Sequence, residues 1–576
     1  MRILIISFLV LSGIVVTSCG GNDPGVDELV AKGGKKYGGE FKFMSQEKIT
    51  SLFPTSSADV YSMRLVSQIF DPLLKIDPET SKITSGVAES YEVSSDALKY
   101  TLKIRKGIKF HSDDCLSEGH ELDANDVKFS LDIACSGLAA NNLSYLLKDR
   151  IEGGREFYTK STSKLPKGGV SGIKVVNDYT IEITLTKPFA GFEAILTHPS
   201  LGVSPREAYD KYGKDIAQHP VGTGPFSLES FSDDKIVLKR NPNYWQEDEF
   251  GNQLPFMSKV IMTYAEDKRS ELMAFRNKEI DLVLEIPADE IDHVFGSLQE
   301  AQDGKNVKHK VDSEHSLSMM YIAMACESDE FSDSRVRKAF NYAIDRETII
   351  EDKLEGEGWP AMNGFVPKMK TYPSEKVKGF TYLPSKAKSL MKEAGYPGGK
   401  GFPKLDFYVN STEGSSVHLT CVAIADQLKE NLGVDLKIVL CGLEEREEAI
   451  QNGKAKIWRG GWIADYPDAE NFLALFYGGN IEEGASMINS FKFQNDAYDK
   501  LFESAQMELD PEKRTSLLVK CDQMVVDQAA LMPILTDDHI VMMNARVRDF
   551  EASPLESLNL TEVFIKEARV TKDKAE

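Results

Sequence analysis

One stretch of the chain brings together a carboxylate, an aromatic side chain and two adjacent glycines. It lies between Lys456 and Leu473 and contains Gly460-Gly461, Trp462 and Asp465. Because glycine has no Cβ, another backbone can approach the chain there, and Trp462 adds a flat apolar surface beside that open edge. Such a strand could pair with a peptide in β fashion while Asp465 holds the peptide's ammonium end. A buried strand leading into a loop, with Asp465 bonded to local backbone, would leave the same pattern.

Residues for catalysis or metal binding form no familiar pattern. The chain has no Gly-x-Ser-x-Gly elbow, no His-Glu-x-x-His pair and no Cys/His/Asn signature, so we expect a protein that is not an enzyme. A hydrolase with an unfamiliar arrangement of Ser, His and Asp stays as an alternative. His111 and His120 bracket an acidic loop, which we expect to be solvated, so we predict no metal and no cofactor. The run Gly222-Thr223-Gly224-Pro225 lacks the ending of a phosphate loop and is expected to be a tight turn.

The length and the net charge of the chain limit its number of domains and its possible partners. A chain of 576 residues is too long for one core and suggests two or three domains. Its formal net charge of −22 argues against a nucleic-acid partner. Among the cysteines, the pairs nearest in sequence are Cys115–Cys135 and Cys421–Cys441, which could form disulfides or stay as buried thiols.

The N-terminus is typical of an exported protein. An apolar run from Ile3 to Val16 is too short to span a bilayer and indicates a secretory signal. The residues before Cys19 resemble a lipoprotein cleavage box, so we predict a signal peptide over 1–18 and lipidation of Cys19. Residues 19–36 would be a loose tether that holds the protein at a membrane surface. An ordinary secretory signal, with Cys19 merely nearby, is the alternative.

Local patterns predict a mixed α/β chain. Strands are expected over 39–44, 100–104 and 180–185, and helices over 60–74, 123–131 and 333–350. In the 333–350 helix we expect one apolar stripe with the arginines opposite it. The order Asp510-Pro511-Glu512 predicts the start of another helix.

A strand–helix–strand unit precedes the glycine-tryptophan stretch. It consists of a strand at 405–409, a helix that stops at Gly433 and a strand at 434–440. This order implies a right-handed crossover and a parallel sheet, whose ligand sites lie at the carboxyl ends of strands. The stretch from Lys456 to Leu473 is therefore expected at a crevice of the sheet.

Several blocks resemble the extracellular solute-binding proteins of family 5, the oligopeptide- and dipeptide-binding proteins of ABC importers. The blocks are Tyr100–His111 with Asn125–Ser130, Gly222–Phe226, Leu238–Trp245, Asp333–Arg346 and Lys386–Tyr396. They follow one another in the order and spacing of that family and extend over nearly the whole mature chain.

The resemblance implies an α/β fold of the type II periplasmic-binding-protein (Venus flytrap) class. Two lobes are joined by a hinge, and lobe 1 carries an extra β-rich subdomain near 66–188. Lobe 1 would comprise 37–286, lobe 2 would comprise 287–532, and 533–576 would return to lobe 1. Prolines at 287 and 533 fit the two crossings. Closure about the hinge would enclose a ligand.

The resemblance also implies a function and a site. The protein would capture a short peptide between its lobes and deliver it, as a monomer, to ABC transporter permease subunits. The ligand-binding residues implied are Arg459, Gly461, Trp462, Ile463, Asp465 and Tyr466 of lobe 2, with Ala58 and Val60 of lobe 1. Asp468 and Glu470 are expected to be solvated or to cap a helix. The same fold could instead carry a sugar, nickel or haem.

Overall fold

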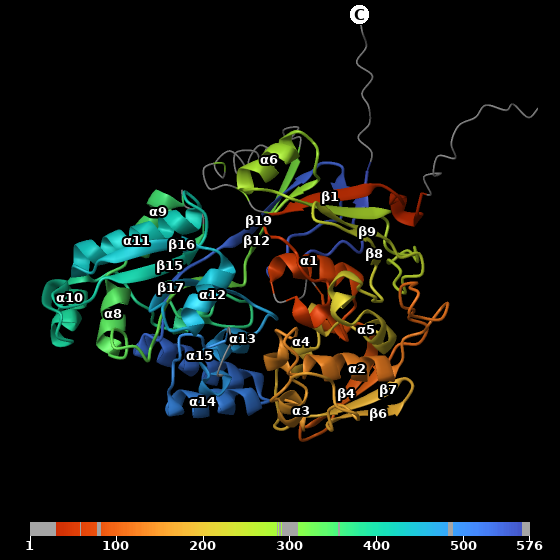
Figure 1. Ribbon diagram of the computed structural model, residues 1–576, viewed down its shortest axis with the longest axis horizontal. Helices are drawn as coiled ribbons and strands as arrows, with labels where there is room; N and C mark the ends of the chain where they lie inside the picture. Colours follow the sequence, from red (N-terminus) through yellow and green to blue (C-terminus); the bar gives the residue numbers. More distant parts are fainter. Residues whose placement is uncertain are drawn as a thin grey trace, which may run out of the picture.

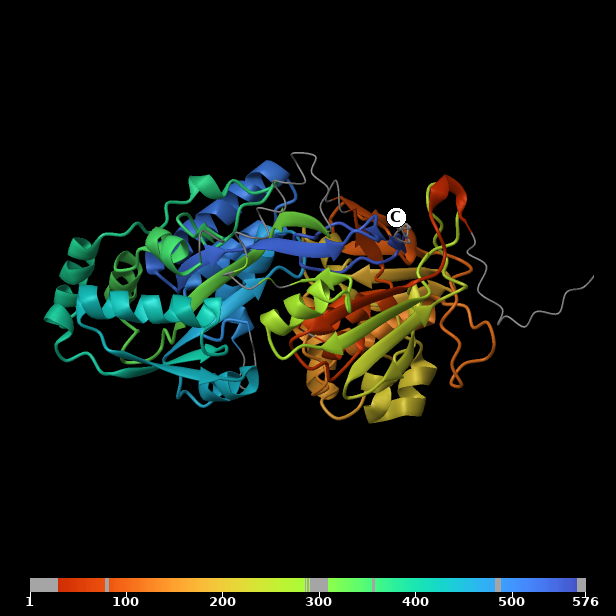
Figure 2. The same cartoon turned by 90° about the horizontal axis from the view of Figure 1, so that it is seen from above.

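The computed structural model of the protein describes residues 30–566 except 58, 78–81, 285, 287–289, 291–308, 355–357 and 482–487. These residues form two lobes that lie side by side (Figure 1), and Figure 2 shows the same two lobes from above. The signal segment, Cys19 and Ala58 lie outside the described residues.

Lobe 1 contains two four-stranded sheets and three smaller ones. The first large sheet has the order β1 (Glu40–Ser45), β10 (Lys259–Tyr264), β9 (Lys235–Arg240), β8 (Phe226–Phe231). The second has the order β4 (Ala88–Val93), β5 (Lys99–Ile104), β7 (Thr180–Thr184), β6 (Ile173–Asn177). The smaller sheets pair β2 (Leu74–Ile76) with β3 (Ile83–Ser85), β20 (Val547–Arg548) with β21 (Phe564–Ile565), and β11 (Leu282–Val283) with β19 (Asp538–Asn544) and β12 (His309–His315).

Lobe 2 is built on one six-stranded sheet. Its order is β14 (Trp359–Pro360), β18 (Met532–Thr536), β13 (Ser318–Met324), β17 (Ile457–Ile463), β15 (Leu405–Asn410), β16 (Leu436–Cys441). Strand β15 is parallel to β16 and β17, whereas β13 is antiparallel to both of its neighbours. The predicted strand–helix–strand unit is confirmed, with helix α11 between β15 and β16.

Helices cover both lobes. In lobe 1 they are α1 (Val60–Ile69), α2 (Ala124–Ala134), α3 (Gly154–Lys160), α4 (Phe192–Ile195), α5 (Arg206–Tyr212) and α6 (Lys268–Arg276). In lobe 2 they are α8 (Ser334–Tyr342), α9 (Arg346–Lys353), α10 (Pro384–Glu393), α11 (Ser416–Leu432), α12 (Leu443–Gln451), α13 (Ala469–Leu473), α14 (Asp496–Met507) and α15 (Pro511–Gln528). Among the described residues, no helix is both long and apolar enough to cross a bilayer.

The chain changes lobes between β12 and β13 and again between β18 and β19. Both passages lie later than the boundaries expected at 286/287 and 532/533. Strand β12 still pairs with β19, whose Val541 and Met543 are buried in a lobe 1 cluster. Pro533 lies inside β18, where it pairs with Tyr321 of the lobe 2 sheet. A proline can occupy a strand position that donates no ladder hydrogen bond, so it does not by itself mark a boundary.

The predicted helix starts are confirmed by their caps. Asp123 accepts hydrogen bonds from the amides of Asn125 and Asp126 at the start of α2, and Asp510 caps α15 with Pro511 in its first turn. Helix α11 ends at Gly433, whose φ of 72° is the left-handed conformation that glycine adopts at little cost.

The single helix expected over 333–350 is wrong. The chain forms α8 and α9 instead, because Asp345 leaves helical geometry and accepts a hydrogen bond from Thr348 N, which starts α9. The prediction that the arginines face away from the core is also wrong for two of them. Arg337 and Arg346 are buried and donate to backbone carbonyls.

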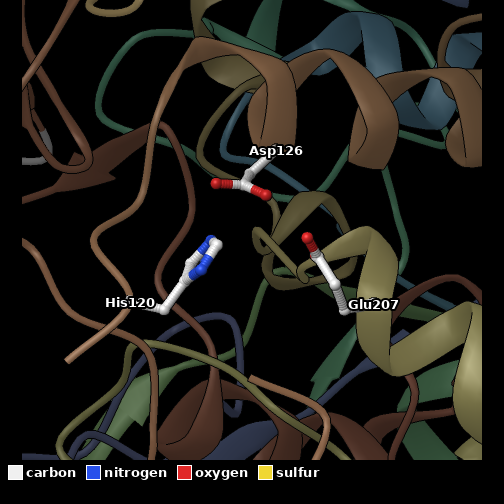
Figure 3. Close-up of side chains that lie close together, drawn as sticks. All are labelled: His120, Asp126 and Glu207. Atoms are coloured by element: carbon white, nitrogen blue, oxygen red, sulfur yellow. The ribbon is translucent and has the colours of Figure 1, made fainter. Parts of the chain in front are cut away.

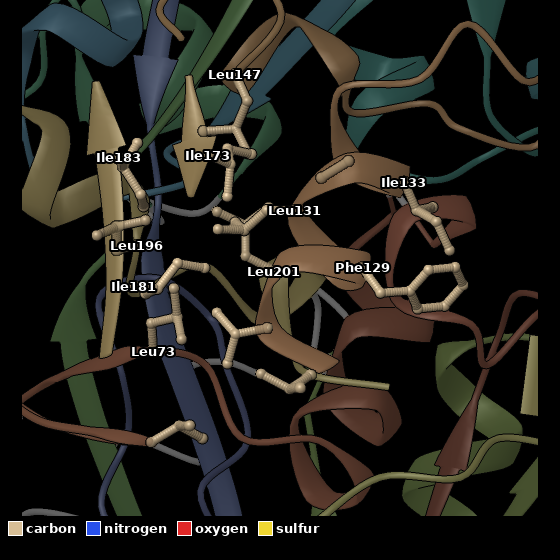
Figure 4. Packing of buried hydrophobic residues seen from close by; sticks show 14 of the residues in the cluster. Leu73, Phe129, Leu131, Ile133, Leu147, Ile173, Ile181, Ile183, Leu196 and Leu201 are labelled. Carbon is tan, nitrogen blue, oxygen red and sulfur yellow. The ribbon is translucent and has the colours of Figure 1, made fainter. Parts of the chain in front are cut away.

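Each lobe has its own buried apolar clusters. Figure 4 shows the cluster of lobe 1 in which side chains of α2 lie against those of β6 and β7. Leu131 of α2 faces Ile173 and Ile181, as the helical stripe of the sequence requires.

Neither cysteine pair forms a disulfide, since the six described cysteines are all free.

Candidate functional site

The glycine-tryptophan stretch forms β17 in the middle of the lobe 2 sheet. Along one side, residues 457–463 pair with β13 over their whole length. On the other side, β15 pairs only with Ile457 and Trp458. No described strand pairs with residues 459–463 on that second side, although Arg446 Nη1 donates to the carbonyl of Arg459. An unpaired strand edge is a place where an extended peptide can add main-chain hydrogen bonds.

The two adjacent glycines have different surroundings. Gly460 is buried beneath the Tyr321 ring, so a Cβ there would lie well inside van der Waals contact of that ring. Gly461 is exposed, and a Cβ there would meet only the guanidinium end of Arg459, at 3.3 Å from Nη2. Gly460 is therefore required by the packing of lobe 2, while Gly461 keeps the outer surface of the strand open.

We expect Gly460→Ala to lower the free energy of unfolding by about 1–3 kcal/mol, the usual cost of overpacking a core. The Tyr321 ring is confined by an edge-on contact with Phe365, with 5.5 Å between ring centroids, so it has little room to move. The matched change Gly461→Ala should stay within about 0.5 kcal/mol of the native protein. Urea unfolding of both variants measures this difference, and equal midpoints would contradict the assignment.

Asp465 lies just beyond β17 and is enclosed by side chains from both lobes. Its Oδ2 accepts hydrogen bonds from Tyr145 OH at 2.7 Å and from Asn471 Nδ2 at 2.8 Å. Its Oδ1 lies 3.7 Å from His198 Nε2, and its side chain is only 16% exposed. Tyr145 belongs to the 3-10 turn Ser144–Leu146 of lobe 1. This carboxylate therefore lies at the junction of the two lobes.

The surroundings of Asp465 favour its ionised form. Burial alone would raise its pKa, but His198 and the hydrogen bonds from Asn471 and Tyr145 outweigh burial and hold the pKa of Asp465 below its ordinary value. His198 Nδ1 accepts a hydrogen bond from Ser200 N, which leaves Nε2 as the protonated nitrogen toward Asp465. The site therefore presents a negative charge in a largely enclosed place.

Asn471 of α13 fixes Asp465 and Trp462 relative to each other. Its Oδ1 accepts from Trp462 Nε1 at 2.8 Å and from Asp465 N at 3.1 Å. Sequence reasoning missed Asn471, Tyr145 and His198. An asparagine in the helix directly after Asp465 was a usable local signal, whereas the two lobe 1 residues have none.

Arg459 of β17 makes no ion pair among the described residues, although the buried carboxyl of Asp537 lies near enough to attract its charge. No described carboxylate lies within ion-pair distance of its guanidinium, and its buried Nε has no hydrogen-bond acceptor among the described residues. Burial, followed by the nearby charge of Arg446, lowers the pKa of Arg459. Its guanidinium is therefore able to receive an anionic group.

The other predicted residues have varied positions. Ile463 ends β17 and is half-buried, and Val60 begins α1 behind the capping residue Asp59. Tyr466 is 1% exposed and belongs to a cluster otherwise made of lobe 1 residues, so it faces protein here.

The two acidic residues after Tyr466 differ from each other. Asp468 accepts a hydrogen bond from Glu470 N at the start of α13, which confirms its expected role as a cap. Glu470 was expected to be solvated or capping, and this is wrong. Its side chain is 0% exposed because it is paired with Arg150 of lobe 1.

His120 lies close to two carboxylates that belong to helices and not to the acidic loop. His120, Asp126 of α2 and Glu207 of α5 have ligand atoms within 4.8 Å of one another (Figure 3). Asp126 also accepts from Asp123 N as part of the α2 capping box, and burial raises its pKa to about 7. Glu207 lies in the first turn of α5, where acidic residues complement the helix dipole. Asp126 is accounted for by the capping box and Glu207 by its place in the first turn of α5, so we assign no metal to them. His111 is not part of the loop's solvated surface, because it is buried with Nε2 2.9 Å from Gly224 O.

Comparison with known proteins identifies the family. The model of the bacterial extracellular solute-binding proteins, family 5, matches residues 82–484. The glutathione-binding protein GsiB of Salmonella paratyphi A is 27% identical over 513 residues, which cover 88% of this chain and 90% of that protein. The periplasmic binding protein DppA of Helicobacter pylori, solved with the peptide STSA, is 24% identical with a TM-score of 0.78 over 92% of this chain and 99% of that one.

A further neighbour is the binding protein AgaA of A. tumefacien R10, solved with agropinic acid. It is 21% identical, with a TM-score of 0.76 over 92% of this chain and 99% of that one. These likenesses confirm the predicted type II periplasmic-binding-protein fold. The chain belongs to the extracellular solute-binding proteins of family 5.

Proposed function

We propose that this family 5 solute-binding protein captures short peptides between its lobes and delivers them to the permease of an ABC importer. The observation that carries the proposal is the enclosed carboxylate of Asp465 beside an unpaired stretch of β17. The carboxylate suits the ammonium of a peptide, and the unpaired strand edge suits the peptide backbone. A relative named for glutathione binding and a neighbour solved with the peptide STSA support such a ligand.

The ammonium end is the part of the ligand that the site selects. Tyr145 and Asn471 offer neutral hydrogen bonds to Asp465, and His198 Nε2 lies 3.7 Å from its Oδ1, so an ammonium of the ligand would share the carboxylate with His198. In an enclosed site, such a pair offsets the cost of desolvation only when its geometry is good. The selection should therefore be strict for a free amino group.

Main-chain pairing would hold the rest of the peptide without reading its side chains. Gly461 and Ile463 would supply backbone groups on the open side of β17, and Trp462 would supply an apolar wall. Arg459, which makes no ion pair among the described residues, would receive a carboxylate of the ligand. From lobe 1, Ala58 and Val60 are proposed to contact the ligand on the basis of the family resemblance. Broad tolerance of side chains follows from this arrangement.

A non-peptide solute is the second candidate. It is favoured by the neighbour solved with agropinic acid, and it would include the sugars, nickel and haem considered from sequence. Native mass spectrometry of the protein, followed by release and sequencing of the co-purifying ligand, distinguishes the two. A mixture of short peptides supports the proposal, whereas one sugar, a metal or haem contradicts it.

We also propose that the protein is exported and held at the cell envelope by a lipid on Cys19. This rests on the small residues before Cys19 and on the run Gly20-Gly21-Asn22-Asp23-Pro24-Gly25 after it. Labelled palmitate should be incorporated into the native protein and not into Cys19→Ser, and equal labelling would contradict the anchor.

A further inference from the structure

A buried ion pair connects the two lobes next to the proposed peptide site. Arg150 Nη2 of lobe 1 lies 3.2 Å from Glu470 Oε1 of lobe 2. The Glu470 side chain is 0% exposed and that of Arg150 is 16% exposed. Glu470 belongs to α13 of lobe 2. This ion pair is enclosed between the lobes.

Glu470 depends on lobe 1 for its direct ion pair. Within lobe 2 it accepts from Gln506 Nε2 at 2.7 Å and from Tyr466 OH, both of which are neutral donors. Arg514 of lobe 2 also attracts Glu470, but its guanidinium is ion-paired with Asp468 at 2.8 Å. Separating the lobes would therefore take Glu470 from its ion-pair partner.

Arg150 also fixes the segment of lobe 1 that reaches Asp465. Its Nη1 donates to the carbonyls of Tyr145 at 2.7 Å and of Leu146 at 3.3 Å. The hydroxyl of the same Tyr145 donates to Asp465. A continuous set of polar contacts thus runs from Glu470 through Arg150 and Tyr145 to the proposed ammonium site.

Apolar contacts strengthen the same junction. The Arg150 guanidinium lies over the Phe189 ring, 4.7 Å from its centroid. Tyr466 of lobe 2 is 1% exposed and belongs to the lobe 1 cluster that contains Phe189. Opening the lobes would expose the Tyr466 ring to water and would also break the ion pair between Arg150 and Glu470.

We propose that Arg150, Glu470 and Tyr466 form a latch that stabilises the closed arrangement of the lobes. Arg150 acts as a positioning residue, because it holds the segment whose Tyr145 donates to Asp465, and Glu470 and Tyr466 hold Arg150 and its surroundings in place. The latch would also set how fast a bound peptide leaves, and this second consequence rests on the proposed function. The first consequence, closure of the protein alone, does not depend on any ligand.

The first experiment measures the radius of gyration by small-angle X-ray scattering, with no solute added. Glu470→Gln and Arg150→Met should both increase the radius of gyration relative to the native protein. The control is Lys187→Gln, which removes the exposed partner of Glu503 across the same junction, where the two charges are 3.8 Å apart. An exposed pair contributes little, so this variant should match the native protein. Equal radii for all four proteins would overturn the latch.

The second experiment is a double-mutant cycle on the dissociation rate of trialanine, followed by tryptophan fluorescence in a stopped-flow instrument. Each single variant leaves one buried charge without its partner and should speed dissociation about tenfold, with association changed less than about threefold. The double variant removes both charges. Its dissociation rate should therefore rise by a smaller factor than the product of the factors found for the two single variants. Additive effects, or effects on association alone, would overturn the latch. If trialanine does not bind while the single variants still open, the latch stands and the proposed peptide function falls.

Discussion

Asp465→Asn is expected to weaken the binding of a peptide with a free amino terminus by about 100-fold. Removing one charge of an enclosed ion pair costs about 3 kcal/mol or more, which corresponds to at least that factor. Asparagine keeps the size of the side chain, and its oxygen can still accept from Tyr145 and Asn471, so the loss reports on the charge and on the contact of Oδ1 with His198. Isothermal titration calorimetry measures the change.

A control variant separates this effect from a general loss of negative charge. Asp406→Asn makes the same change in β15, where the carboxylate is half-exposed and lies 4.0 Å from Lys437. Its affinity should stay within about twofold of the native protein, because exposed charges of this kind contribute little. Native affinity in Asp465→Asn would remove Asp465 from the site.

Arg337→Ala is expected to lower the free energy of unfolding by about 3 kcal/mol or more. Arg337 is 5% exposed and donates from Nε to Ala529 O and from Nη2 to Gln528 O, each at 2.9 Å. It also donates to the carbonyl of Phe331, so it ties the end of α15 to the segment before α8. Each buried carbonyl left without a donor costs about 1–3 kcal/mol. Urea unfolding measures the loss.

Arg335→Ala provides the matched comparison on the same helix. Arg335 has a half-exposed side chain and pairs with Asp333, two residues earlier in sequence. Surface pairs contribute about 0–1 kcal/mol, so this variant should unfold near the native midpoint. If the two arginine variants unfold alike, the buried contacts of Arg337 do not support lobe 2.

Local sequence was sufficient for the elements whose causes are local. Capping by Asp123 and Asp510, the stop at Gly433 and the strand order around α11 each depend on a few neighbouring residues. The position of β17 and the glycine-tryptophan pattern followed from the same kind of signal. Asp465 could be singled out because it stands directly after that strand.

The partners of Asp465 could not be found in this way. Tyr145 lies 320 positions away in sequence, and only the meeting of the lobes brings its hydroxyl to the carboxylate. The same is true of Glu470, which looks like an ordinary surface residue until Arg150 is known to oppose it. A charged residue is predicted to be solvated unless its partner is known, because burial without one is too costly. Charged contacts between distant segments therefore had to come from the structure.

Calorimetric titration with one short peptide, in free and in N-acetylated form, tests the central claim most directly. Acetylation removes the ammonium charge and leaves the remaining peptide groups available for pairing with β17. If Asp465 selects the amino terminus, the free peptide binds and the acetylated peptide binds about 100-fold more weakly or not at all. Equal affinity for the two forms would contradict the account.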